Sequence, residues 1–148
     1  MNTSTEPGAT PGPFADDHRR AGAVRMFSLV NGLTLLGVLL QAVWAGEFID
    51  HAGQGAWITV HEIGAFVVVV LALANALTTV PLWRTHSALT LGAFSLLVLI
   101  VVETGLGEAI TRAGANELIV AHVPIAILVF GLGVYLSIMG ARPSRSTA

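Results

Sequence analysis

Two histidines, His61 and His122, stand inside long apolar stretches of the sequence, each near the start of its stretch. A neutral imidazole donates a nitrogen lone pair to a metal, and an apolar environment favours the neutral form. Iron in a haem accepts such ligands on the two faces of its planar macrocycle. The pair is therefore a candidate set of metal ligands.

Other polar residues are rare in these stretches, and a charged side chain at the centre of a membrane helix costs roughly 2.5–3.5 kcal/mol. Each is a candidate for function, and the set comprises Asn31, Gln41, Glu62, Asn75 and Glu103. Glu62 is rotated by about 100° from His61 on a helix, so we expect it to face another helix or the interface. We expect Glu103 to hold a proton, to pair with the second nitrogen of a histidine, or to contact the polar edge of a ligand.

The chemistry of the pair favours haem over zinc. Structural zinc takes four ligands and catalytic zinc three plus a water, whereas cysteine is absent from the chain. Glu103 would be a third ligand, but it lies deeper, roughly 12 Å from the end of its helix at about 1.5 Å per residue. We therefore expect haem b with His61 and His122 on the iron. The alternative for the same two side chains is hydrogen bonding between helices without a cofactor.

The elements that must position these residues are four apolar segments, at residues 24–48, 56–82, 88–111 and 117–140. Each exceeds the roughly 20 residues that a membrane-spanning helix needs. Because the connections are short, the sequence predicts an all-α, up-and-down four-helix bundle in the membrane over residues 21–141. Residues 1–20 are predicted to form a disordered cytoplasmic tail, and residues 142–148 a second one.

The composition agrees with an integral membrane protein. Of 148 residues, 54% are hydrophobic and 11% are charged, against roughly 25% charged in an average soluble domain. This excludes a soluble globular enzyme. The net charge of −2 and the lack of a basic stripe exclude nucleic acid as a partner.

The arginines give the expected orientation. Six of the seven cationic residues fall at one side of the four segments, and only Arg112 falls at the other. By the positive-inside rule, both termini are expected in the cytoplasm, with the chain in the inner (plasma) membrane of a bacterial cell. Asn116 is expected to be the N-cap of the fourth helix. An alternative is a signal peptide ending at Val43-Trp44-Ala45, but its apolar run exceeds the roughly 7–15 residues of such peptides.

The two histidines are expected at one depth in the membrane. Both lie roughly 7 Å below the start of their helices, and the second and fourth helices of such a bundle usually sit on a diagonal. At helical spacing each histidine is followed by mostly small residues: Gly64, Ala65, Val68, Ala72, Asn75, Ala76 and Thr79, and Ile125, Ala126, Val129, Gly133, Ser137 and Gly140. Small residues allow tight helix packing, and they also leave room for a broad ligand. We expect Gly64, Ala65 and Ala126 to contact it.

The segment from Glu103 to His122, ETGLGEAITRAGANELIVAH, resembles the third-to-fourth-helix segment of haem A synthase. In that family a polar residue, a Leu-Gly pair, a short outer loop and a helix-borne His follow in this order. The Gly46 region and His61 resemble the first half of the same pattern. The resemblance covers Leu39 to Leu136, one four-helix half of a family built from two. It implies a haem near the outer face with both histidines as axial ligands, and Glu103 where the family often has Gln.

Two positions depart from the pattern of that family. Ile58 stands where the family has a glutamate important for its oxidation chemistry, and Glu62 stands where it usually has Arg. The outer-loop cysteine pair of some members is missing, and the sequence matches one half only. The resemblance therefore supports a haem site more than it supports the reaction.

Three functions follow from these observations. The first is a small, cytochrome b-like membrane haem protein for electron transfer or haem handling, beside a respiratory or haem-processing partner. The second is a homodimer that modifies haem as haem A synthase does. The third is a cofactor-free membrane scaffold or a subunit of a larger complex. Transport is disfavoured, because four helices without an inverted repeat make a small pathway.

Overall fold

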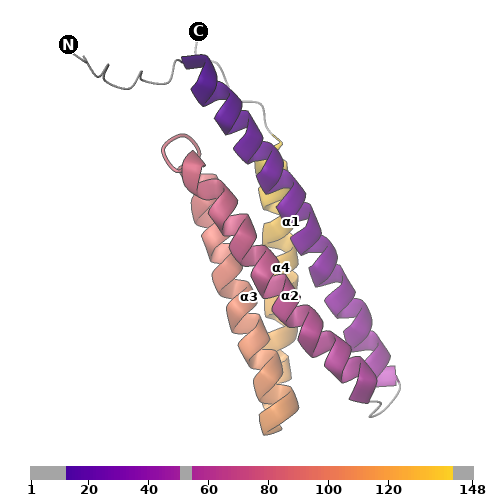
Figure 1. Cartoon of the computed structure of the whole chain (residues 1–148). Coiled ribbons are helices and arrows are strands. Elements are labelled where there is room, and N and C mark those ends of the chain that lie inside the picture. The colour runs from indigo at the N-terminus through magenta and orange to yellow at the C-terminus, as the bar shows by residue number, and fades with distance from the viewer. Residues whose placement is uncertain (1–12, 51–54, 142–148) are drawn as a thin grey trace, which may run out of the picture.

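The apolar runs of the sequence form long helices, which satisfy every internal backbone hydrogen bond within one segment. A computed structural model describes residues 13–50 and 55–141. In this part of the chain the α-helices are α1 (Pro13–Asp50), α2 (Gly55–Thr79), α3 (Ser87–Ala113) and α4 (Ile119–Gly140), with short 3₁₀ turns η1 (Val80–Leu82) and η2 (Asn116–Leu118) (Figure 1). Four helical segments are long and apolar enough to cross a membrane.

Proline and glycine set the helix ends in the second half of the chain. α2 passes into η1, which contains Pro81, a residue that cannot donate a backbone hydrogen bond to continue the helix. α3 ends before Gly114, whose φ of 69° is in the left-handed region. That conformation closes a helix at little cost in glycine, and the Gly114 N–H donates to the carbonyl of Ala109.

Two helix starts differ from the sequence predictions. α1 begins at Pro13, although the sequence predicts a tail through residue 20 and a helix from residue 24. Proline is well tolerated at the first helical position, where the backbone N–H would lack a partner anyway. The predicted N-cap Asn116 is instead the first residue of η2, and α4 begins after Leu118 without a side-chain cap. There the Leu118 N–H donates to the Ala115 carbonyl at 3.0 Å. The rest of both predicted tails, residues 1–12 and 142–148, lies outside the described residues.

The helices form a ring in which each packs on its chain neighbours and α1 also packs on α4. Within the described segments, the pairs α1–α3 and α2–α4 make no close backbone approach. α2 and α4 therefore lie on a diagonal, as the sequence predicts. Figure 1 shows α1 extending beyond the other helices at one end, while the α1–α2 and α3–α4 hairpins diverge at the other.

The end at which the hairpins diverge carries both histidines, and we call it the histidine end: residues 41–47, 55–63, 103–113 and 119–126. None of these residues is fully buried, whereas the other half of the bundle contains fully buried side chains such as Phe27, Leu96 and Leu136. On α2 the predicted inward stripe is buried from Gly64 to Thr79, with Ala65 half-buried. The side chains of the bundle are thus more deeply buried away from the histidines than around them.

A polar network ties three helices together inside the tightly packed half. Asn31 Nδ2 donates to Ser137 Oγ at 2.7 Å and to the Gly133 carbonyl at 2.9 Å. Asn75 Nδ2 donates to Asn31 Oδ1 at 3.0 Å, and both asparagines have an exposed fraction of 0%. Because buried polar groups are costly unless paired, this network specifies how α1, α2 and α4 meet.

Replacing Asn31 by alanine is expected to lower the free energy of unfolding by about 1–3 kcal/mol, because the buried amide of Asn75 loses its acceptor. The measurement is unfolding in detergent micelles followed by circular dichroism. Ser28→Ala is the matched control, since this exposed hydroxyl donates to the Val24 carbonyl of its own helix. Equal stability of the two variants would show that the network does not hold the helices together.

Candidate functional site

His61 lies in the second turn of α2, and His122 lies in the first turn of α4. Both side chains are half-buried. Their helices make no close backbone approach to each other. The structure therefore brings the two predicted ligands to the same end of the bundle, on diagonal helices.

The imidazole of His122 is supported by α3. Its Nδ1 atom lies 3.1 Å from Glu103 Oε1, with exposed side-chain fractions of 24% and 15%. This distance is within hydrogen-bonding range, but the ring N–H is not aligned with the oxygen. The ring also interacts with the backbone of Glu103. Of the three roles expected for Glu103, pairing with a histidine nitrogen is the one that this geometry fits.

A histidine whose Nδ1 faces a carboxylate offers the lone pair of Nε2 to a metal. A glycine of α3 keeps space beside this ring: a Cβ atom added to Gly107 would lie 3.4 Å from His122 Cε1. Gly107 belongs to the Leu-Gly pair of the resemblance, but nothing in the sequence predicted that it lies beside His122. The α3 face thus supplies a carboxylate near Nδ1 of His122 and a glycine beside its ring.

The imidazole of His61 is supported by α1, because it interacts with the backbone of Gln41. Its Nδ1 atom is buried, as is Nδ1 of His122. One turn further along α2, a Cβ atom added to Gly64 would collide with Gln41 Nε2 and with the indole of Trp44. Gly64 therefore lets α1 approach α2 closely beside His61. Gln41 was noted in the sequence only as a polar residue, since its partner helix face could not be predicted.

The predicted ligand contacts Gly64, Ala65 and Ala126 stay predictions, and Gly64 packs against Gln41 and Trp44 of α1. Ala65 and Ala126 are half-buried, and Gly64 is buried against α1. In the chain as described, no group of three His, Cys, Asp or Glu side chains is arranged to hold a metal ion. The site consists of two imidazoles and one carboxylate partner, so any iron bound there needs most of its ligands from a macrocycle.

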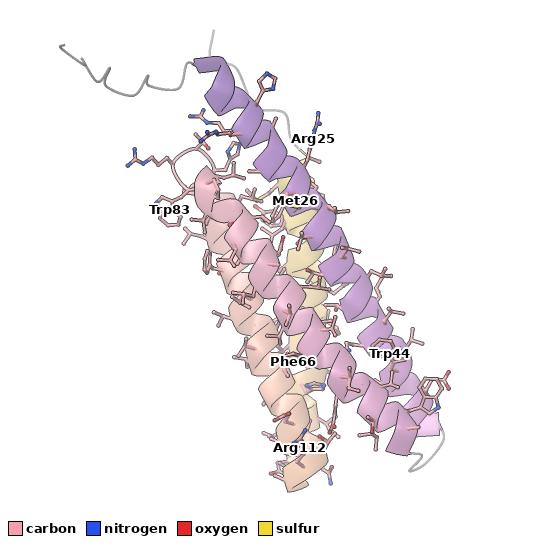
Figure 2. All side chains as sticks on the ribbon, viewed as in Figure 1. Arg25, Met26, Trp44, Phe66, Trp83 and Arg112 are labelled. Carbon is pink, nitrogen blue, oxygen red and sulfur yellow. The ribbon has the colours of Figure 1, made fainter. Side chains whose placement is uncertain are left out.

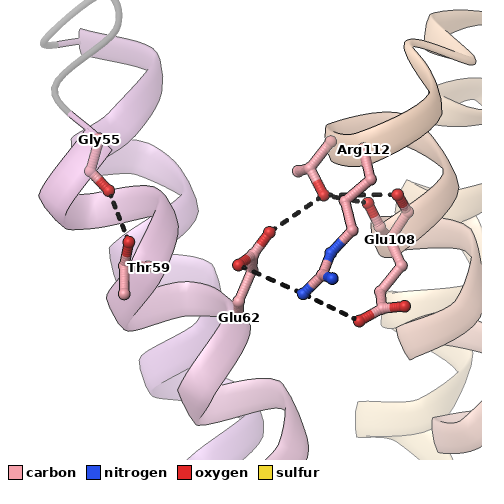
Figure 3. Close-up of polar contacts among 7 residues, drawn as sticks. Gly55, Thr59, Glu62, Glu108 and Arg112 are labelled. Atoms are coloured by element: carbon pink, nitrogen blue, oxygen red, sulfur yellow. Dashed lines mark hydrogen bonds and ion pairs between the residues drawn. The ribbon is translucent and has the colours of Figure 1, made fainter.

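Glu62 joins α2 to α3, which confirms that it faces another helix. Thr111 Oγ1 donates to Glu62 Oε1 at 3.4 Å, and Arg112 Nη2 lies 3.8 Å from Glu62 Oε2 and 3.5 Å from Glu108 Oε1 (Figure 3). The Arg112 side chain is 65% exposed. Exposed ion pairs stabilise a fold by only about 0–1 kcal/mol, so this cluster adds little to the stability of the bundle.

No known protein family, curated protein or solved structure matches the chain. The resemblance to haem A synthase therefore stays a prediction from the residues of the sequence. The functional proposal depends on the geometry of the histidine end.

Proposed function

We propose that the protein is a small membrane haem protein that holds one b-type haem between His61 and His122. The observation that carries the proposal is the placement of these two histidines at the same end of the bundle, on the diagonal helices α2 and α4. A porphyrin supplies the equatorial nitrogens of its iron, so two protein ligands on opposite faces complete the coordination. No third side-chain ligand is needed.

The surroundings of the histidines fit a broad, flat group. No residue of the histidine end is fully buried, and Gly107 and Ala126 present little side-chain volume beside His122. Glu103 would hold Nδ1 of His122 and so orient Nε2 toward the iron.

The proposed ligand set favours electron transfer or haem handling. A bound haem would supply a one-electron couple, and His61 and His122 would hold its iron. The chain's own residues would orient the iron ligands and surround the group with apolar side chains. A respiratory or haem-processing membrane protein is the class of partner that this chemistry requires.

We also propose that the histidine end faces the outside of a bacterial inner membrane, with both termini in the cytoplasm. The arginines at the opposite end, Arg19, Arg20, Arg25 and Arg84, are all exposed. Figure 2 shows Arg25 and Arg112 at opposite ends of the bundle. Cytoplasmic loops carry an excess of arginine and lysine, which supports this orientation.

Titration of the detergent-solubilised protein with ferric haem tests the proposal. We expect the Soret absorbance to saturate at one haem per chain, because one pair of histidines provides one site. Empty micelles are the control for haem that dissolves in detergent. An absorbance that rises without saturation, as in the empty micelles, would overturn the proposal and favour a cofactor-free scaffold.

Replacing Glu103 by leucine is expected to weaken haem binding by about 10–100-fold, because His122 loses the partner that orients its ring. Glu103→Gln keeps an oxygen acceptor at the same place and is expected to bind haem within a few-fold of the wild type. The measurement is the same haem titration, with circular dichroism to confirm that both variants are helical. Identical affinities for Glu103→Leu and the wild type would contradict an orienting role.

A further inference from the structure

The first turns of α1 extend beyond the rest of the bundle. Among the described side chains of α1, Phe27 is the first that is fully buried, and a Cβ atom added to Gly140, the last residue of α4, would lie 2.9 Å from its ring. Ala23 and Val24 are half-buried and pack on the core. Residues 13–22 precede them and cover roughly 15 Å at about 1.5 Å per residue. Figure 1 shows this extension beyond the turn that joins α2 to α3.

The turn that joins α2 to α3, residues 80–86, packs against α1 beside this extension. Leu82 is 0% exposed, and η1 approaches the backbone of α1. The N–H groups of Thr85 and His86 both donate to the Leu82 carbonyl, at 3.0 and 2.7 Å. Arg84 lies inside this hydrogen-bonded turn, and its side chain is exposed. The backbone that carries Arg84 is therefore held next to α1.

Arg20 lies on the face of α1 that is directed toward this turn. It precedes Val24 by one helical turn and Phe27 by two, so it shares the face with which they pack on the bundle. Arg20 is exposed, because the bundle ends before it. Arg25 is rotated by about 140° from Arg20, and Figure 2 shows it on the side of α1 away from the turn. Arg20 and Arg84 therefore border one corner between α1 and the turn, and Arg25 does not.

The charges of the described side chains are separated between the two ends of the bundle. At the end with the corner, the exposed charged residues are Arg19, Arg20, Arg25 and Arg84. The carboxylates among the described side chains lie at or beside the histidine end: Glu47, Glu62, Glu103, Glu108 and Glu117. Asp16 and Asp17 belong to α1 but precede its arginines, further from the bundle. The corner is therefore suited to an anion.

The level of the corner in the membrane indicates which anion it meets. Arg84 lies between the candidate spans Gly55–Leu82 and Ser87–Ala113. Its neighbour Trp83 is 50% exposed, and tryptophan is enriched where the hydrocarbon meets the headgroups. Val80, in the same turn, is also 50% exposed. The corner thus combines guanidinium groups at headgroup level with an apolar surface for acyl chains.

We propose that this corner binds an anionic phospholipid, with its phosphate between Arg20 and Arg84 and its acyl chains beside Trp83. A guanidinium donates two parallel hydrogen bonds to phosphate oxygens, which a single ammonium cannot do. A soluble phosphate would use the arginines but not the exposed Val80 and Trp83. The proposal does not depend on haem, because the corner lies at the end opposite the histidines.

Tryptophan fluorescence in vesicles tests the proposal. The chain contains three tryptophans, so a Trp44→Phe/Trp57→Phe protein retains only Trp83. It is reconstituted in phosphatidylcholine with increasing fractions of either phosphatidylglycerol or phosphatidylcholine that carries brominated acyl chains, which quench a tryptophan in contact with them. We expect phosphatidylglycerol to quench Trp83 at the lower fraction. Arg20→Gln and Arg84→Gln should each weaken this preference by about tenfold or more, the loss expected for hydrogen bonds to a charged group.

Arg25→Gln is the matched control, because it removes the same charge from an exposed position of the same helix outside the corner. Its expected loss is only about a few-fold, as for any arginine near an anionic surface. Inorganic phosphate should not reduce the quenching by phosphatidylglycerol. Equal quenching by the two lipids would overturn the proposal. Equal losses in Arg25→Gln and Arg20→Gln would also overturn it, since only the summed charge would attract the lipid, and so would displacement of the lipid by inorganic phosphate.

Discussion

Replacing either His61 or His122 by alanine is expected to abolish the haem spectrum of the protein. Each substitution removes one of the two proposed iron ligands, and the helices on which they lie do not otherwise approach each other within the described segments. Removing a side chain that only orients a metal ligand lowers the affinity for the metal by about 10–100-fold. Loss of a ligand itself should lower haem affinity by at least about 100-fold.

The measurement is the Soret and α-band absorbance of variants purified with haem supplied. His86→Ala is the matched control, because His86 lies in the connection between α2 and α3, where its Nδ1 is 3.0 Å from Thr85 Oγ1. This variant should bind haem like the wild type. Retention of the full spectrum in both His61→Ala and His122→Ala would exclude the proposed ligands, whereas loss of it in His86→Ala would point to a different histidine.

Replacing Gly64 by alanine is expected to have the largest effect on stability among the glycine variants. The added Cβ would collide with the Gln41 amide and the Trp44 indole, and a rigid indole between two helices cannot move aside easily. Overpacking a well-packed contact costs about 1–3 kcal/mol. Because His61 interacts with the backbone of Gln41, displacement of α1 should also reduce haem occupancy.

Gly105→Ala is the control for Gly64→Ala, since a Cβ atom at Gly105 has no neighbour within 4 Å. Alanine is the better helix former by about 1 kcal/mol, so this variant should be as stable as the wild type or more so. Thermal unfolding in detergent, followed by circular dichroism, compares the two. A Gly64→Ala protein that melts at or above the temperature of Gly105→Ala would show that α1 does not pack on Gly64 as described.

The two halves of the bundle have different roles in this account. The half with Asn31, Asn75 and Ser137 is buried and hydrogen-bonded across three helices. The histidine end lacks fully buried residues and carries the candidate ligands. We propose that the hydrogen-bonded half fixes the helices, so that the less buried half can hold the proposed cofactor.

Much of this arrangement could be predicted from the sequence, because helix length and apolar periodicity depend on local residues. The inward stripe of α2 after His61 and the diagonal placement of α2 and α4 are examples. The contacts between helices could not be predicted in the same way. The contact of Gln41 with Gly64 and that of Gly107 with His122 depend on how two helices are rotated and how they cross. A single sequence determines neither the rotation nor the crossing.

The start of α1 shows a different limit of sequence analysis. Closely spaced prolines favour an irregular tail, yet one of them, Pro13, opens the helix. Proline disrupts a helix interior but is well tolerated at its first position. The residue type alone does not say which of these two situations applies.

The most direct test of the central claim is the near-infrared magnetic circular dichroism spectrum of the oxidised, haem-loaded wild-type protein. The energies of its charge-transfer bands depend on which two axial ligands the iron has. We expect the spectrum of a low-spin haem with two imidazole ligands, as His61 and His122 would provide. A high-spin spectrum, or the spectrum of an iron with only one imidazole, would contradict it.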